Sequence, residues 1–348
     1  MTRVGIIGIG FMGWIHWLAY HRLSDVRVSA ISESLPQRLA GDWRDIKGNF
    51  GPPGEQVDLS EINAYANLDD LLHDPQVDLV DITLPTSQHA DVAIRALEAG
   101  KHVLCEKPMA LRPADCERMV AAARKADRLL FVGHVLPFFP EYNWALQVIR
   151  SGQYGKLLGG SFKRVISNPA WLTHFWSPEH IGGPMLDLHI HDAHFIRLAF
   201  GMPHQVTTTG RLRNDLPEYW HSQFRFNDRD LVVAATSGTI EQQGRAFTHA
   251  YEIQLEKATL VFDFAVIGGE GRVLCEPMLF DTEGQVQKAN LPSSDPIDSF
   301  CNELREVTTC VRDNRPSETL GASLAQDAMR ICAAQSESLK TGTPVLVH

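Results

Sequence analysis

A glycine-rich motif near the N-terminus constrains the fold of this chain more than any other feature. Residues 4–7 are an apolar run typical of a buried strand, a helical pattern begins after residue 13, and Gly8-Ile9-Gly10-Phe11-Met12-Gly13 lies between them. In such a GxGxxG motif the glycines permit a tight turn, a close approach of the backbone to a pyrophosphate, and close packing of helix on strand. The start of the helix adds N–H groups and a positive dipole end. The motif therefore predicts a dinucleotide-binding domain in which these residues contact the cofactor.

The end of the second predicted strand indicates which dinucleotide is bound. Residues 26–31 form this strand, and Glu33 follows it. An acid about 20 residues beyond the glycines accepts hydrogen bonds from the adenosine ribose hydroxyls. Its charge would also repel a 2′-phosphate, which favours NAD over NADP. Ser32, Ser34 and Arg38 are close in sequence and could hold that phosphate, so NADP stays open as an alternative.

Two later strands of the first half end in side chains suited to a ligand. The strand at 77–84 leads from Leu84 into Pro85, Thr86 and His89, which are candidates for the cofactor pocket, although His89 could equally pack locally. The strand beginning at residue 102 ends in Glu106, Lys107 and Pro108, because proline lacks a backbone donor and fixes φ. Open α/β sheets bind their ligands at the carboxyl ends of the strands. We therefore expect Glu106 and Lys107 to face the cofactor, and Lys107 to contact the substrate as well.

The order of elements predicts two domains. Strands and helices alternate up to residue 134, which implies a parallel, doubly wound sheet over residues 1–134. Residues 135–348 contain many strand-like runs and few helices, which predicts an α+β domain with a large, mainly antiparallel open sheet that binds the substrate. His134, Trp171 and Trp176 are candidate substrate-binding residues, since aromatic side chains with polar tips suit stacking on sugar rings and also serve as core lids.

One segment of the second domain combines acids with histidines. Helical spacing places Asp187, His191 and His194 on one stripe. A carboxylate one turn from an imidazole can orient it and raise its basicity, which suits proton transfer near neutral pH. Two other interpretations stay open: His189, His191 and His194 could bind a divalent metal, or the stripe could be a polar face toward water.

Charge and hydropathy exclude several classes of function. The formal net charge of −10 over 348 residues argues against nucleic acid as the main partner. No apolar run reaches the roughly 18 residues needed to span a membrane. The N-terminus enters the first strand directly, without a signal-peptide pattern, and the six cysteines form no CxxC pair. We expect a cytoplasmic protein that acts on a small molecule.

The glycine loop, the sequence Glu106-Lys107-Pro108, the pair Gly182-Gly183 and the D-x-x-x-H spacing of Asp187 and His191 together resemble the Gfo/Idh/MocA oxidoreductase family. The resemblance implies a Rossmann domain joined to a domain with an open, mostly antiparallel sheet, and a last helix that packs back towards the first domain. It implies NAD(P)-dependent oxidation or reduction of a hydroxyl or ketone on a sugar, inositol or related polyol. By resemblance Lys107, Asp187 and His191 are the catalytic residues, and the chain forms a homodimer or homotetramer.

Three functional hypotheses follow. The first is an NAD-dependent polyol dehydrogenase. The second is an enzyme that processes glycosides with a retained cofactor or a metal. The third is a non-catalytic regulator that binds NAD.

Overall fold

The computed structural model describes residues 1–170, 172–292 and 295–348, which form two compact units. The first unit comprises residues 1–138 and 295–326, and the second comprises residues 139–292 and 327–348. The chain therefore changes unit at residue 139, a few residues beyond the division predicted after residue 134. It also returns to the first unit for a later segment that contains helix α8 (Pro296–Asp313). Within the described residues, no helix is long and apolar enough to cross a bilayer.

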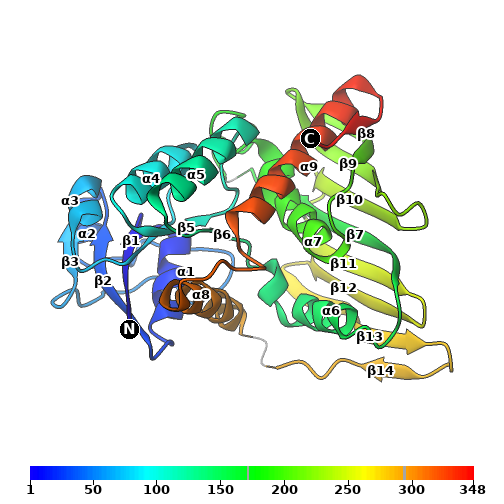
Figure 1. Ribbon diagram of the computed structural model, residues 1–348, viewed down its shortest axis with the longest axis horizontal. Helices are drawn as coiled ribbons and strands as arrows, with labels where there is room; N and C mark the ends of the chain where they lie inside the picture. The colour runs from blue at the N-terminus through cyan, green and yellow to red at the C-terminus, as the bar shows by residue number, and fades with distance from the viewer. Residues whose placement is uncertain (171, 293–294) are drawn as a thin grey trace. The chain divides into compact units, whose positions relative to one another are not determined.

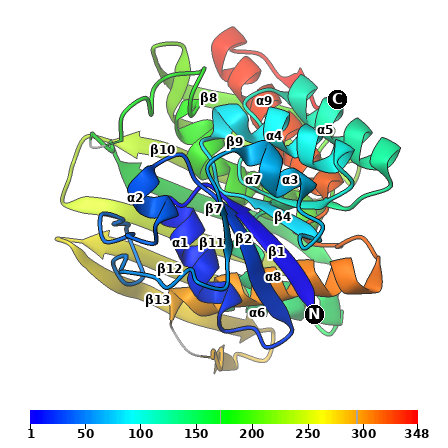
Figure 2. The same cartoon turned by 90° about the vertical axis from the view of Figure 1, so that its left-hand side faces the viewer.

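The first unit is built on a six-stranded sheet in which every pairing is parallel, as predicted. Its spatial order is β3 (Asn63–Tyr65), β2 (Val26–Ser32), β1 (Thr2–Ile7), β4 (Leu79–Ile82), β5 (His102–Glu106) and β6 (Leu130–Gly133). Helices α1 (Phe11–Tyr20) and α8 cover one face, and α4 (Thr86–Glu98) and α5 (Pro113–Ala126) cover the other (Figures 1 and 2). Shorter helices are α2 (Pro36–Leu39) and α3 (Leu68–His73).

The strand order fixes where this unit can bind a ligand. The chain moves outward from β1 to β2 and β3, and then returns to place β4 on the other side of β1. Right-handed crossovers in the two directions put the helices on opposite faces, so that loops diverge at the carboxyl ends of β1 and β4. Such a switch point is where doubly wound sheets bind dinucleotides. The glycine loop, residues 83–86 and residues 106–108 all follow strands that end at this edge.

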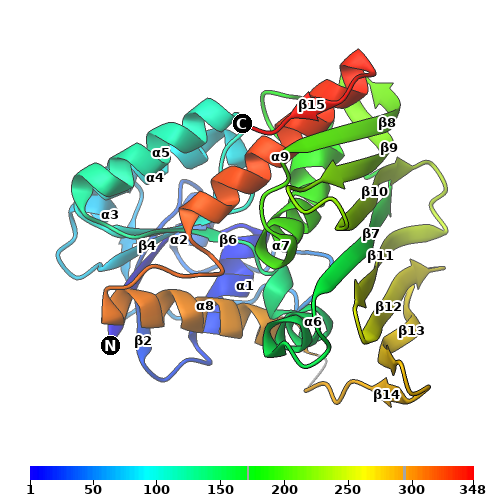
Figure 3. The ribbon, with the colours of Figure 1, turned by 45° about the vertical axis from the view of Figure 1, so that its right-hand side comes forward.

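The second unit contains a nine-stranded sheet, predicted as mainly antiparallel and observed so. Its order is β14 (Val286–Lys288), β13 (Glu270–Asp281), β12 (Ala258–Ile267), β11 (Arg245–Leu255), β7 (Leu157–Ser167), β10 (Val232–Ile240), β9 (Leu216–Arg225), β8 (Gln205–Arg213) and β15 (Val345–Leu346). Only β7 and β10 pair in parallel among these strands of the described chain. Helices α6 (Pro140–Ser151), α7 (Ile190–Phe200) and α9 (Ala322–Thr341) lie along one face of the sheet (Figure 3).

Buried and exposed side chains alternate along β7, so that the two faces of this sheet differ in burial. Phe162 and Arg164 point toward the helices and are buried, whereas Ser161 is exposed and Lys163 partly exposed on the opposite face. The buried guanidinium of Arg164 binds the Asp192 carboxylate of α7 through two hydrogen bonds, of 2.7 and 3.0 Å. A buried charge of this kind needs such a partner, because desolvation alone would cost several kcal/mol. The pair therefore anchors α7 to the centre of the sheet.

Candidate functional site

The glycine loop has the geometry that a pyrophosphate site needs. Gly8 has φ +91°, a conformation that L side chains rarely adopt. A Cβ atom on Gly13 would lie 2.3 Å from the carbonyl oxygen of Gly8, so only glycine allows the first turn of α1 to pack against the loop. A Cβ on Gly10 would meet no atom within 4 Å. The space beside Gly10 therefore fits a phosphate, next to the N–H groups that the first helical turn leaves without intrahelical partners.

Glu33 and Arg38 hold the second residue of this loop from two sides. The Ile9 N–H donates to Glu33 Oε2 at 2.8 Å, and Arg38 donates to the Ile9 carbonyl oxygen at 2.8 Å. The other oxygen of Glu33 accepts from the Leu35 N–H at 2.9 Å. Arg38 also pairs with Asp45 at 2.7 Å. Both predicted cofactor residues thus lie at the glycine loop, with Glu33 mostly buried and Arg38 already engaged by another carboxylate.

The turn after β4 is tied to the turn after β5 by His89. Its Nδ1 lies 2.9 Å from the Pro108 carbonyl oxygen, and its Nε2 lies 2.8 Å from the Leu84 carbonyl oxygen. The ring is buried, and burial lowers the pKa of His89. A neutral ring carries one N–H and donates it to one of these two oxygens, so His89 lies packed between the two turns at the ligand edge. Pro85 and Thr86 begin α4 at the same edge.

The turn after β5 places Lys107 beside a buried acid. The Glu106 side chain turns into the unit, and its Oε2 accepts the Lys107 N–H at 3.0 Å. Lys107 itself is partly exposed. His134 follows β6 at the neighbouring position of the sheet and is buried. The structure therefore brings Lys107, Glu106 and the glycine loop to one edge of one sheet.

In the second unit, Asp187 and His191 lie on a distorted helix. Gly182 and Gly183 have φ of +81° and +70°, and a π-helical turn, Met185–His189, follows before α7 begins. A π turn holds more residues per turn than an α-helix, so the regular α-helical spacing assumed for Asp187, His191 and His194 does not apply through this turn. Asp187 and His191 are partly exposed, whereas His194 is fully buried.

His189 belongs to the core of the second unit. Its Nδ1 lies 2.8 Å from Ser237 Oγ on β10, and its Nε2 lies 3.0 Å from Gln335 Oε1 on α9. Burial lowers the pKa of His189 to about 4. Both ring nitrogens are therefore used in holding α7 between the sheet and α9. Over the described ranges, no group of three or more His, Cys, Asp or Glu side chains is arranged to hold a metal ion.

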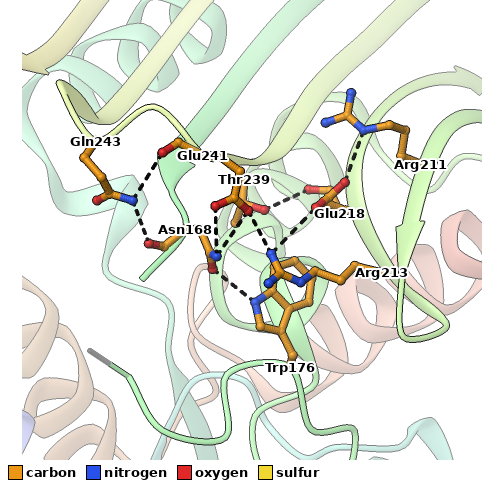
Figure 4. A network of polar contacts seen from close by, with 8 residues as sticks. All are labelled: Asn168, Trp176, Arg211, Arg213, Glu218, Thr239, Glu241 and Gln243. Atoms are coloured by element: carbon orange, nitrogen blue, oxygen red, sulfur yellow. Dashed lines mark hydrogen bonds and ion pairs between the residues drawn. The ribbon is translucent and has the colours of Figure 1, made fainter. Parts of the chain in front are cut away.

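Trp176 borders a pocket of about 350 Å³ that is also lined by Asn168, His174 and Arg213. The Trp176 Nε1–H donates to Asn168 Oδ1 at 3.1 Å, and the Arg213 guanidinium lies 4.8 Å from the centre of the indole ring. Arg213 in turn pairs with Glu241 at 2.8 Å, within the network of Figure 4. Arg213 therefore covers one face of the indole ring. Trp171, the other predicted aromatic contact, lies outside the described residues.

Several residues of the ligand edge were missed by reasoning from sequence. Thr83 donates to the Gly8 carbonyl oxygen at 2.6 Å and so braces the glycine loop. His16 on α1 and Asp81 on β4 are fully buried, 2.8 Å apart, and adjoin Glu106. In the sequence, each of these two residues appears only as a polar residue within an apolar segment. Because α1 and β4 are far apart in the chain, neither segment predicts that His16 and Asp81 contact each other.

Comparison with known proteins agrees with this architecture. Residues 2–134 match the model of an oxidoreductase family with an NAD-binding Rossmann fold, and residues 142–261 match the GFO/IDH/MocA C-terminal domain. The chain is 31% identical over 199 residues to myo-inositol 2-dehydrogenase of Thermotoga maritima, an alignment that covers 57% of this chain and 55% of that protein. It is 33% identical over 165 residues to inositol 2-dehydrogenase/D-chiro-inositol 3-dehydrogenase of Lactiplantibacillus plantarum, covering 45% and 42%. The aligned part is thus about half the length of these relatives.

Solved structures share the fold along the whole chain. Levoglucosan dehydrogenase in complex with NADH superposes with a TM-score of 0.81 at 20% identity, covering 100% of this chain and 99% of that one. A probable dehydrogenase of Thermotoga maritima superposes with a TM-score of 0.79 at 23% identity, covering 99% and 98%. The matches to the two family models together span well over half of the sequence. The chain belongs to the Gfo/Idh/MocA family of oxidoreductases.

Proposed function

We propose that this protein is an NAD-dependent dehydrogenase that oxidises a hydroxyl group of a sugar, an inositol or a related polyol, or reduces the corresponding ketone. The observation that carries the proposal is the ligand edge of the first unit, where the open space beside Gly10 and the lysine of the Glu106–Lys107 turn share one end of a parallel sheet. Family membership and inositol dehydrogenases among the relatives support the same chemistry.

NAD is the cofactor that the described residues fit best. When bound, its nicotinamide ring accepts a hydride from a carbinol carbon. Glu33 would accept a hydrogen bond from a ribose hydroxyl and repel a 2′-phosphate. Arg38, a cation at the glycine loop, is already bound to Asp45 and to the Ile9 carbonyl oxygen, so it is poorly placed to compensate a phosphate. We therefore propose a preference for NAD over NADP.

Three residues would take part in the proton transfer of the reaction. Oxidation of a carbinol releases a hydride from carbon and a proton from oxygen. We assign acceptance of that proton to His191 or Lys107, and to Lys107 the binding of the substrate oxygen. Asp187 would bind a neighbouring hydroxyl and orient the proton acceptor. The partial exposure of all three side chains supports these roles.

The pocket beside Trp176 supports a polyol as the substrate class. Its lining combines the aromatic rings of Trp176 and Phe175 with the polar side chains of Asn168, Ser177 and Arg213. Polyols present both C–H faces and hydroxyl groups, and carbohydrate sites pair aromatic rings with hydrogen-bonding groups for that reason. We infer that this pocket, together with Trp171 and His134, contributes to substrate binding.

A second copy of the same chain is the protein partner that we propose. The helices of the second unit lie along one face of its nine-stranded sheet (Figure 3). The other face carries Thr209, His221 and Glu252 as exposed side chains. Pairing of two such faces would yield a homodimer, and a second interface between two dimers would yield a homotetramer. Light scattering of the purified protein would report either state, and a monomer at micromolar concentration contradicts both. We place the protein in the cytoplasm, where its six free cysteines stay reduced.

The test is the absorbance of NADH or NADPH formed from NAD or NADP with a panel of sugars, inositols and sugar acids, each with and without a chelator. We expect turnover of one polyol class with NAD, unaffected by the chelator. If no member of the panel is turned over although the protein binds the nucleotide tightly, the proposal is contradicted, and a retained cofactor or a regulatory role is favoured. Loss of activity with chelator would point to a metal.

A further inference from the structure

A fully buried cluster of ionisable side chains lies behind the Glu106–Lys107 turn of the first unit. His16 on α1 is at its centre: Nδ1 lies 2.8 Å from Asp81 Oδ2 on β4, and Nε2 lies 3.2 Å from Glu106 Oε1 at the end of β5. Tyr20 on α1 and Glu303 on α8 complete the cluster, and both are buried. Three acids, one histidine and one phenol are thus enclosed in one unit, and none of the family's catalytic groups is among them.

The charges within the cluster make His16 a cation. Burial alone would lower the pKa of His16, but the carboxylates of Asp81 and Glu106 raise it well above its ordinary value. Burial, and then the negative charge of Glu106, raises the pKa of Glu303 well above its ordinary value. Burial and the Asp81 carboxylate likewise raise the pKa of Tyr20. These directions favour a protonated His16 beside Asp81 and Glu106, and a neutral acid and a neutral phenol at Glu303 and Tyr20.

The two oxygens of Glu106 connect this cluster to Lys107. Oε1 faces His16, and Oε2 accepts the backbone N–H of Lys107 at 3.0 Å. Gly133 on β6 also lies against the carboxylate, because a Cβ atom there would be 2.9 Å from Glu106 Oε1. The orientation of the carboxylate, and with it the backbone of Lys107, is thus set by groups from α1 and β6.

We propose that His16 is a positioning residue for Lys107, acting through the Glu106 carboxylate. The imidazolium holds Glu106 in the one orientation in which it receives the Lys107 N–H. Asp81 binds the opposite side of the ring at Nδ1, so that Nε2 stays 3.2 Å from Glu106 Oε1, within ion-pair distance. This inference rests on the proposed role of Lys107 in catalysis, and it assigns to His16 no contact with substrate or cofactor.

Two substitutions of His16 separate the contacts that the ring makes. His16→Gln places an amide N–H near the position of Nε2 and keeps a donor toward Glu106. His16→Asn places one near the position of Nδ1 and keeps a donor toward Asp81. Both remove the same charge from the same buried site, so a purely structural role predicts similar losses of stability and similar behaviour at Lys107.

The first readout is the backbone amide resonance of Lys107 in the full-length protein, which requires no substrate. We expect His16→Asn to shift this resonance and to speed exchange of the amide proton, and His16→Gln to retain most of the wild-type behaviour. The Gln76 amide is the internal control, because it donates to the Asp74 carboxylate at 2.7 Å elsewhere in the same unit. Equal behaviour of the two variants at Lys107, or no shift in His16→Asn, overturns the proposal.

The second readout is kinetic and uses the polyol found in the panel. For His16→Asn we expect kcat to fall at least about tenfold with KM for NAD within about twofold, and for His16→Gln a loss of about threefold or less. Glu303→Gln, which replaces a neutral acid by a neutral amide, is expected to change neither the Lys107 amide nor kcat. If Lys107→Met turns over normally, the proposed function fails. If Lys107→Met is inactive but the two His16 variants are equal, only this inference fails.

Discussion

At the scale of single residues, three buried histidines of this protein each contact groups from more than one element. His89 ties two turns together, His189 joins α7 to the sheet and to α9, and His16 lies between two carboxylates. His16 and His189 were visible in the sequence as histidines between apolar neighbours, whereas His89 follows polar residues. Which of the three faces a ligand could not be predicted, because the contacts of His16 and His189 come from elements far away in the chain and one contact of His89 comes from the turn after β5.

The raised pKa of Glu303 has a measurable consequence for stability. Its folded pKa lies above its unfolded value, so the folded chain keeps a proton that the unfolded chain releases. The wild type therefore loses stability as pH rises above the unfolded pKa and toward the folded one, by at most about 1.4 kcal/mol per pH unit. The variant Glu303→Gln has no such proton.

We expect the difference in free energy of unfolding between Glu303→Gln and the wild type to shift in favour of the variant as pH rises from about 5 to about 8. The absolute difference at a single pH is not diagnostic, since the amide buries its own polar atoms. Urea unfolding of both proteins across this pH range measures the slope. A constant difference would show that Glu303 is ionised in the folded protein.

At the scale of elements, the glycine loop was the part of the site that the sequence specified best. The spacing of Gly8, Gly10 and Gly13 indicates a tight turn between strand and helix, which Glu33, Arg38 and Thr83 then brace from outside the motif. The helix that carries Asp187 and His191 was specified less well. Its sequence is compatible with a regular helix. The π-helical turn at Met185–His189 occurs where His189 and Asp192 make tertiary contacts with the core.

The loop glycines predict two different defects. Gly13→Ala places a Cβ 2.3 Å from the Gly8 carbonyl oxygen, so we expect a loss of stability of about 1–3 kcal/mol together with weaker NADH binding. Gly10→Ala places its Cβ in open space, so we expect an unchanged melting temperature and a loss of NADH binding of at least about tenfold. Thermal unfolding and fluorescence titration with NADH separate the two. Tight NADH binding by Gly10→Ala would contradict the proposed position of the pyrophosphate.

At the scale of the whole molecule, periodicity predicted both sheets, because a parallel sheet reads as continuous apolar strands and an antiparallel one as alternation. It did not predict that α8 belongs to the first unit. The amphipathic pattern of α8, whose start is capped by Asp295, indicates that one face of the helix is buried. It does not indicate against which sheet that face packs. The pocket beside Trp176 was not predicted either, since Arg213 reaches the indole ring, and Glu241 reaches Arg213, only once distant strands have paired.

The central claim is that Lys107 carries out chemistry in a polyol dehydrogenase, and the most direct test compares Lys107→Met with the wild type and with Lys101→Met. Lys101 is the matched control, because its amine donates to the carbonyl oxygens of Asp74 and Val77 at the opposite end of β5. We predict that Lys107→Met loses at least about 100-fold in polyol-dependent NADH formation while its affinity for NADH stays within about twofold. Lys101→Met should keep its activity per folded molecule. Turnover by Lys107→Met near that of the wild type would contradict the account.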